Sequence, residues 1–449
     1  MKKREIIRVA ITEVIMTLAV IFLTFAFVMV VSGYWINSDL EVKQNGFIQV
    51  YSSPRGATIK VDDDTWFNRT NASQMVSSGE REITLSRDGY DTWTKKITVS
   101  EGVLYRLAYP RLFKQNRETV KMLNVEGKKV SISYNKNKLL LMDSGAIFEF
   151  IDLTRDTFLP KKVDVSGANL NGNLVSNIVW SENGEKILIS TKDGQWVLVS
   201  TEKNDYLNLT KEFGLNFSII KSLDDAYNDL VVVENGNLRK INTNSKSISN
   251  VLATNVKQIW SYDEGMFYLA SDTSNNESIY YMIDEKESVK IRDGASASQL
   301  TYARFYDEKY LAILDGEKLE VYRGEMPRSA TEELNMELVF EDEIAFGGNL
   351  SVGLSGNFIL IKNGLTISAL NMEEMKISKY DLESDSYGWL DNYLVYVVQD
   401  GKMIVRDFDG ENRREIVLSD VNASYPATIT RDRYLYYFVE NTLVREEIQ

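Results

Sequence analysis

The fold of this chain is decided by the stretch from Val175 to Thr210, which reads VSNIVWSENGEKILISTKDGQWVLVSTEKNDYLNLT. Short runs rich in aliphatic and β-branched residues alternate there with polar turns that contain Gly, Asn or Asp. We predict four strands, over Ser176–Trp180, Lys186–Ser190, Gln195–Ser200 and Tyr206–Thr210. Four short antiparallel strands joined by tight turns are typical of one blade of a β-propeller.

The hairpin between the second and third of these strands recurs along the chain. Several copies turn through Asn-Gly or Asp-Gly, the pairs that supply the positive φ of a type I′ turn. Successive turns are 37 to 49 residues apart, a spacing that indicates propeller blades rather than a helical solenoid. The turns lie at Gly145, Gly194, Gly236, Asn275, Gly316, Gly364, Gly401 and Asn441.

These repeats predict a β-propeller over residues 118–449. The last unit, from Tyr425, has room for only three strands, and an unpaired strand edge invites aggregation. We therefore expect Glu118–Val125 to supply the missing strand and to complete eight blades. Seven blades is the alternative if this closure does not form.

The turn after Trp180 carries a family resemblance. Trp180-Ser181-Glu182-Asn183-Gly184-Glu185-Lys186 resembles the Trp-Ser-Pro-Asp-Gly-Lys turn of TolB-like and WD40-like propellers, with Glu182 and Asn183 in place of Pro and Asp. The resemblance implies the fold and names no partner. Trp180, Trp260 and Trp389 each end a first strand, and we interpret them as filling between blades rather than as ligand platforms.

An uncharged segment from Val14 to Ser38 precedes the β region, and Val14–Val31 is almost continuously apolar. About 20 helical residues cross a hydrocarbon core of about 30 Å. Basic residues come before the segment and acidic residues after it, so the positive-inside rule places the N-terminus in the cytoplasm and the rest outside. A cleaved signal peptide is the alternative. The expected anchor residues are Val14, Leu18, Phe22, Phe25, Val28, Tyr34 and Trp35.

A second module lies between this segment and the propeller. Strand-like alternation flanks the turn Pro54-Arg55-Gly56-Ala57, and further alternating runs follow up to residue 99. This stretch resembles the PEGA domain family, named after a Pro-Glu-Gly-Ala turn, although Arg55 stands where the family has Glu. The resemblance covers about residues 46–112 and implies a small, non-catalytic β-sandwich of bacterial and archaeal surface proteins.

The chain is therefore expected to be all-β apart from one transmembrane helix. We expect a cytoplasmic tail (1–8), a transmembrane signal-anchor helix (9–35), a stalk (36–45), the PEGA-like β-sandwich (46–112) and the propeller (118–449).

Composition restricts the function. The 449 residues include no His and no Cys, which excludes Ser-His-Asp and Cys-His catalysis, disulfides and the usual zinc ligands. The net charge of −14 argues against nucleic acid as a partner. We expect no catalytic, cofactor-binding or metal-binding residues.

The interpretation that remains is a binding or scaffold protein, anchored in the cell membrane. Its expected partners are the lipid bilayer, through the N-terminal helix, and a cell-envelope polysaccharide or surface protein. The alternatives are a carboxylate-dependent envelope glycosidase and an envelope-assembly or signalling component.

Overall fold

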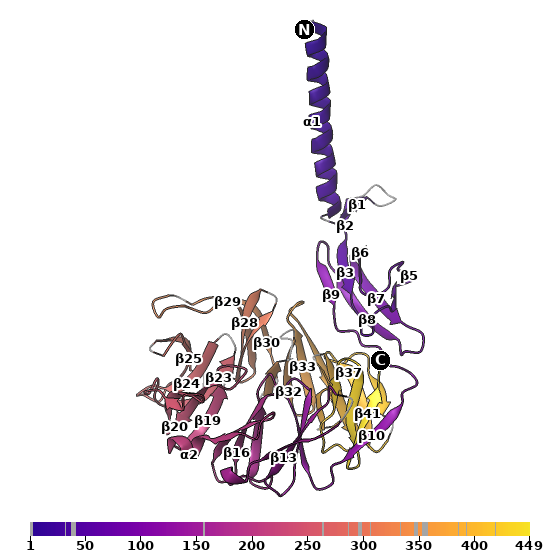
Figure 1. Ribbon diagram of the computed structural model, residues 1–449. Helices are drawn as coiled ribbons and strands as arrows, with labels where there is room; N and C mark the ends of the chain where they lie inside the picture. Colours follow the sequence, from indigo (N-terminus) through magenta and orange to yellow (C-terminus); the bar gives the residue numbers. More distant parts are fainter. Residues whose placement is uncertain are drawn as a thin grey trace. The chain divides into compact units, whose positions relative to one another are not determined.

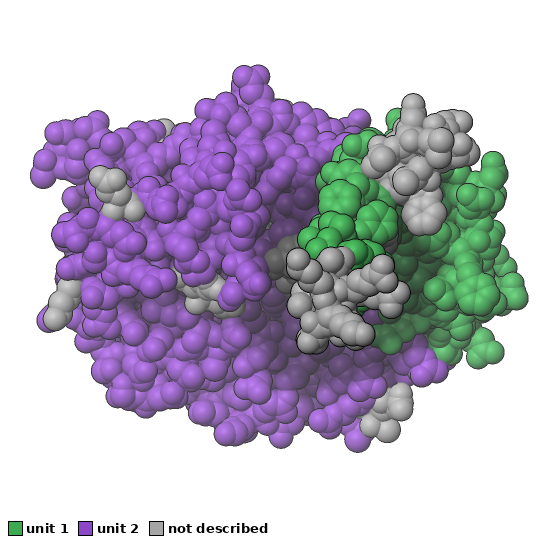
Figure 2. All heavy atoms as spheres, turned by 90° about the horizontal axis from the view of Figure 1, so that it is seen from above, with its two compact units in different colours: residues 1–118, 447–449 green, residues 119–446 purple. Residues whose placement is uncertain are grey.

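The computed structural model describes residues 3–31, 33–36, 42–155, 158–262, 265–285, 287–294, 299–305, 307–332, 334–344, 349–352, 358–384, 386–391, 393–417 and 419–449. The chain is almost entirely β apart from one long N-terminal helix (Figure 1). It divides into two compact units, one made of residues 1–118 with 447–449 and the other of residues 119–446 (Figure 2).

The first unit begins with α1 (Lys3–Val31). Within it, Ile11–Met29 has a mean hydropathy of 2.3, and none of this stretch is buried in the protein. The helix is long and apolar enough to cross a membrane. After it, β1 (Tyr34–Ile36) and β2 (Val42–Gln44) pair antiparallel, so part of the segment expected as a stalk lies in a short strand ladder.

Two sheets follow in the same unit. The first pairs β6 (Ala72–Val76), β3 (Gly46–Val50) and β9 (Leu104–Leu107), and the second pairs β5 (Asp64–Thr65), β4 (Thr58–Val61), β7 (Gly79–Ser86) and β8 (Trp93–Val99). Burial alternates along β8, with Trp93, Ile97 and Val99 inside, as a two-residue period requires. The fully buried Trp93 packs edge-on against Tyr109 at a ring distance of 6.0 Å.

Residues 447–449 complete the first unit although they come last in the sequence. The Lys114 amide donates to the carbonyl of Ile448 at 2.9 Å, and the Ile448 side chain is buried. The side-chain amide of Gln449 donates to the Ser53 hydroxyl at 2.8 Å. This unit is therefore built from two distant parts of the chain.

The second unit is a series of four-stranded antiparallel sheets, which we call blades. The described residues form eight of them. The first four are β11 (Lys129–Ile132), β12 (Lys138–Met142), β13 (Ile147–Asp152) and β14 (Lys161–Asp164); β15 (Val175–Trp180), β16 (Lys186–Thr191), β17 (Trp196–Ser200) and β18 (Tyr206–Asn208); β19 (Phe217–Ser222), β20 (Asp229–Glu234), β21 (Asn237–Asn242) and β22 (Ser247–Ile248); and β23 (Val256–Tyr262), β24 (Gly265–Ser271), β25 (Glu277–Met282) and β26 (Ser288–Asp293).

The other four blades follow the same strand order, except that the last takes one strand from the start of the unit. They are β27 (Gln299–Phe305), β28 (Glu308–Asp315), β29 (Lys318–Glu325) and β30 (Asn335–Glu343); β31 (Asn349–Val352), β32 (Phe358–Asn363), β33 (Thr366–Asn371) and β34 (Lys376–Asp381); β35 (Tyr387–Trp389), β36 (Leu394–Gln399), β37 (Lys402–Asp407) and β38 (Arg414–Val417); and β39 (Thr428–Thr430), β40 (Tyr434–Val439), β41 (Thr442–Glu447) and β10 (Thr119–Asn124).

The last blade confirms the predicted strand closure. β10 pairs antiparallel with β41, with Thr119 opposite Glu446 and Asn124 opposite Thr442. Beyond β10, Val125 is fully buried and its amide donates to the carbonyl of Asn441 at 2.7 Å. The first and last strands of the unit therefore share one sheet.

Adjacent blades pack through apolar faces. One buried cluster joins Leu140 and Phe148 of one blade to Trp180 and Ile187 of the next. Burying side chains of this size contributes about 1.5–3 kcal/mol each relative to leaving them exposed. Trp180 and Trp260 both lie in such clusters, in agreement with their interpretation as filling, whereas Trp389 is only partly buried.

One predicted strand ends early. Leu209 and Thr210, which we expected in the fourth strand of the deciding stretch, begin the helix α2 (Leu209–Phe213). The side chain of Asn208 caps this helix by accepting from the Lys211 amide at 3.0 Å, and Gly214 ends it with a left-handed φ of +63°. A short 3₁₀ turn, η1 (Ser166–Ala168), also lies between blades.

Candidate functional site

The expected anchor residues lie on α1 and just after it. Five of these apolar side chains are more than half exposed: Val14, Leu18, Phe22, Phe25 and Val28. An exposed apolar surface of this kind is typical of a contact with a membrane or with another protein. Tyr34 is half-buried in β1. The backbone of Trp35 pairs with Lys43, and the side chain of Trp35 lies outside the described residues.

Hydrogen bonds to Thr70, a residue that the sequence analysis did not select, stabilise the Pro54-Arg55-Gly56-Ala57 turn of the first unit. Thr70 is buried, and its Oγ1 accepts from the amides of Gly56 at 3.0 Å and Ala57 at 2.9 Å. The Ser52 and Thr70 hydroxyls are 2.6 Å apart. Gly56 has a φ of +85°, a conformation that favours glycine, and Ala57 is fully buried.

A Thr in a polar loop gives no signal of burial, because its hydroxyl and methyl suit either solvent or the interior. Arg55 is exposed, as expected for a turn arginine, and its carbonyl accepts a hydrogen bond from Arg87 at 2.7 Å.

The first strands of the blades lie towards the centre of the propeller. Each of these strands is the edge strand of its sheet, and β19, β23, β27 and β31 contact one another in succession. In a propeller, strands in this position surround the central channel. Side chains at the ends of these strands therefore meet at one mouth of the channel.

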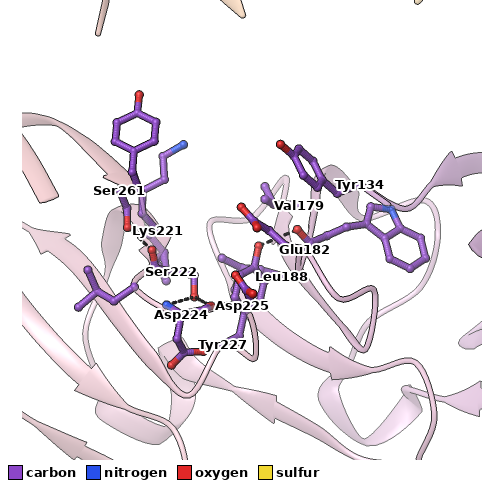
Figure 3. Close-up of a pocket in the computed structure, with 14 residues that line it drawn as sticks. Tyr134, Val179, Glu182, Leu188, Lys221, Ser222, Asp224, Asp225, Tyr227 and Ser261 are labelled. Carbon is purple, nitrogen blue, oxygen red and sulfur yellow. Dashed lines mark hydrogen bonds between the residues drawn. The ribbon is translucent and has the colours of Figure 1, made fainter. Parts of the chain in front are cut away.

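A pocket of about 210 Å³, which we call the mouth pocket, opens at the ends of β15, β19 and β23 (Figure 3). Trp180 and Tyr227 contribute to its wall, and Tyr134, which follows β11, stands at one side. Glu182, Lys221, Asp224 and Asp225 bring charge to it. Residues from four different blades thus line one concavity, a usual position for ligand binding.

Hydrogen bonds fix the walls of the mouth pocket. The Tyr227 hydroxyl donates to the carbonyl of Trp180 at 3.0 Å, and the Ser222 hydroxyl donates to the carbonyl of Asp224 at 2.6 Å (Figure 3). The Ser261 hydroxyl donates to the carbonyl of Ser222, which links β23 to β19. The indole of Trp180 donates to Ser131 of the preceding blade at 2.9 Å.

The acidic groups of the mouth pocket have different roles. The Asp224 carboxylate accepts from the backbone amides of Ala226, Asn228 and Asp229, at 2.8 to 3.1 Å, and so shapes its own loop. Asp225 is exposed, and among the described residues its carboxylate has no hydrogen-bonding or ion-pair partner. Glu182 is also exposed. The surface offered to a ligand is therefore acidic.

Two tyrosines of the mouth pocket, Tyr227 and Tyr262, are neutral. Burial raises the pKa of Tyr227, and the nearby charge of Glu182 adds to the rise. Burial also raises the pKa of Tyr262. Both phenols therefore stay protonated at physiological pH and act as hydrogen-bonding groups on an aromatic wall.

In the described part of the chain, no three or more Asp or Glu side chains form a group that could hold a metal ion. The acidic turn at Asp407–Asn412 is held by its own contacts. Asp407 is fully buried, and its Oδ2 accepts from the Asn412 side chain at 2.9 Å.

Comparison with known protein families identifies one domain of the first unit. Residues 45–111 match the PEGA domain family and are a PEGA domain, as the resemblance implied. No curated protein matches the chain.

The solved structures similar to this chain include β-propellers. The C-terminal WD40 domain of Sif2 is 11% identical, over 74% of this chain and 98% of that chain, with a TM-score of 0.47. The β-propeller domain of Cps50 (Swd1) from Myceliophteria thermophila is 10% identical, over 66% and 97%, with a TM-score of 0.40. The computationally designed protein Ika8 is 14% identical, over 73% and 99%, with a TM-score of 0.45.

The likeness to these structures is distant, so the fold rests on the sheets described above. The chain combines an apolar N-terminal helix, a PEGA domain and a β-propeller. The two β domains suggest a binding or scaffold protein.

Proposed function

We propose that this chain is a membrane-anchored binding or scaffold protein of the cell envelope. In this proposal α1 spans the membrane with its N-terminus in the cytoplasm, and the PEGA domain and the propeller lie outside. The helix supports the membrane part, because its apolar side chains are exposed over Ile11–Met29.

The mouth pocket is the observation that carries the binding part of the proposal. It gathers aromatic walls and exposed carboxylates from four blades into one concavity. Carboxylates and aromatic faces both attract cations, and a net charge of −14 steers basic partners towards the protein. We therefore propose a surface protein with a basic contact region as the partner, and a neutral envelope polysaccharide as the alternative.

The test is capture of partners by the full-length protein in mild detergent, from solubilised membranes of cells that express it. Asp225→Lys reverses an exposed charge of the mouth pocket. The matched control is Asp205→Lys, which makes the same charge change on the exposed turn between β17 and β18. Because one charge contact is worth about 1.5–3 kcal/mol, Asp225→Lys should lower partner retention about tenfold or more.

The control variant should retain the partner as the unaltered protein does. Equal retention by both variants would remove the mouth pocket as the binding site, and no retained partner at all would contradict a binding function. In parallel, the same incubations are analysed for released sugars. Release of sugars that is lost in Glu182→Gln would establish the glycosidase alternative in place of simple binding.

A further inference from the structure

A second hollow lies in the PEGA domain, beside the Pro54–Ala57 turn. It has a volume of about 260 Å³, and we call it the turn hollow. Gly56 of the turn and Thr58 of β4 form one side, and Ser86, Arg87 and Tyr90, at and after the end of β7, form another. Arg69, from the loop between β5 and β6, completes it. Three separate segments of the chain thus converge on one concavity.

The turn hollow is lined by hydrogen-bonding groups with spare capacity. Within the described residues, the side chains of Thr58, Arg69 and Ser86 make no hydrogen bond or ion pair. Each hydroxyl can donate and accept, and the guanidinium has five N–H donors. The hollow therefore offers many polar contacts to a ligand and few apolar ones.

The second arginine of the turn hollow is held in place. Arg87 donates from Nη1 to the carbonyl of Arg55 at 2.7 Å, and its guanidinium lies 5.1 Å from the centre of the Tyr90 ring. These two contacts fix the plane of the guanidinium while other N–H groups remain for a ligand. A fixed planar guanidinium binds carboxylate or phosphate through paired hydrogen bonds.

Charge also favours an anion in the turn hollow. Arg69 and Arg87 face a single carboxylate, Asp88, which forms no ion pair with either of them. Residues 45–111 hold nine Lys and Arg against eight Asp and Glu, a net charge of +1 in a chain of −14. The PEGA domain is therefore a locally neutral to basic part of an acidic protein.

An exposed aromatic side chain lies close by in the sequence. Phe67 lies two residues before Arg69 and is 99% exposed, whereas its neighbour Trp66 is buried. Aromatic faces pack against the apolar faces of bound groups, and a fully exposed Phe has no role in the core. The loop from Trp66 to Thr70 thus exposes both an aromatic ring and a guanidinium.

We propose that the turn hollow binds anionic sugars, that is, polyhydroxylated units that carry a carboxylate or phosphate. The arginines take the charged group, and Thr58, Ser86 and the Tyr90 hydroxyl take sugar hydroxyls. This site is separate in residues and in charge from the mouth pocket, so it goes beyond the proposed function and does not depend on it. A binding domain of this kind would attach the protein to an acidic envelope polymer.

The experiment measures binding of defined probes to the full-length protein in detergent by calorimetry. The probes are trigalacturonate, glucose 6-phosphate, neutral maltotriose and inorganic phosphate. Arg69→Gln removes one charge from the turn hollow, and Arg55→Gln removes the same charge from an exposed side chain of the adjacent turn that does not line the hollow.

We expect at least one of the two anionic sugars to bind more tightly than maltotriose and than phosphate. Arg69→Gln should weaken this binding about tenfold, the effect of losing one charge-assisted contact, while Arg55→Gln leaves it within about twofold. The carboxylate and phosphate probes identify which acidic group is preferred.

Four results would overturn the proposal. Equal loss in the two variants would mean general charge attraction, binding of maltotriose as tight as that of the anionic sugars would exclude anion recognition, and binding of phosphate alone would exclude a sugar ligand. Absence of binding by all four probes would also contradict it. Amide hydrogen exchange of both variants checks that the domain stays folded.

Discussion

Thr70 shows how one side chain can hold a tight turn in place. Its Oγ1 is the acceptor for the buried amide of Ala57 and a second acceptor for the amide of Gly56. The backbone of Thr70 adds hydrogen bonds with Gly56 and Ala57 at 2.9 Å. The PEGA turn is therefore attached to the loop that carries Arg69.

Replacing Thr70 by Val removes the hydroxyl and nearly preserves the shape of the side chain. The buried Ala57 amide then loses its acceptor, which should lower the free energy of opening of this region by about 1–3 kcal/mol. Hydrogen exchange with mass spectrometry on the full-length protein should show faster exchange at Gly56 and Ala57. Thr70→Ser keeps the oxygen and is the control; the same acceleration in both variants would show that the methyl group, and not the hydroxyl, matters.

The candidate site residues differ in how far a single sequence could reveal them. The turn Pro54–Ala57 was visible because Pro and Gly restrict the backbone in known ways. Thr70, Arg69 and Asp225 were not singled out, because each is an ordinary polar loop residue whose importance comes from neighbours that the fold brings close. Tyr134 and Tyr227 come from different blades, and no sequence spacing relates them.

At the scale of elements, the closing strand is the feature with the clearest consequence. β10 comes from the start of the second unit and forms the outer strand of its last blade. Without β10, one side of β41 has unpaired backbone groups, and such an edge promotes aggregation. We propose that this pairing closes a ring of eight blades.

A pair of shortened chains tests the closing strand. A chain of residues 118–449 keeps β10, whereas a chain of residues 126–449 lacks it. Both chains lack the part of the first unit that contacts residues 447–449, so this loss is the same in the two. We expect the longer chain to be monomeric by light scattering, and the shorter chain to aggregate or to unfold at a clearly lower temperature. Equal melting temperatures and equal mass would contradict closure by this strand.

The elements themselves were predicted well where short-range chemistry determines them. Asn235 and Gly236 have φ of +49° and +79°, and Asp400 and Gly401 have φ of +51° and +73°, as the type I′ turns required. The helix α2 was missed although Asn208 and Gly214 are favourable capping residues, because its five residues are too few to show a helical period. The small strands β1 and β2 were missed because three residues carry no clear alternation.

At the scale of the whole molecule, the two β units offer surfaces of opposite charge. The mouth pocket of the propeller presents exposed carboxylates, and the turn hollow of the PEGA domain presents arginines. In our two proposals, basic ligands bind the propeller and acidic ligands bind the PEGA domain. In the proposed arrangement the protein holds two kinds of envelope component near the membrane, which is the role of a scaffold.

The central claim is that α1 anchors the chain and places both β units outside the cell. It can be tested directly because the chain has no Cys, so one introduced thiol is the only thiol present. Lys3→Cys places it before the apolar segment, and Lys203→Cys places it on an exposed turn of the propeller.

The decisive measurement is labelling of each variant by a membrane-impermeant maleimide on intact cells, with any outer barrier opened. We predict that the thiol at position 203 is labelled at once, that the thiol at position 3 is labelled only after the membrane is permeabilised, and that both variants remain in the membrane fraction. Labelling at position 203 only after permeabilisation would contradict the proposed orientation. A soluble mature chain that begins near Tyr34 would contradict the anchor itself.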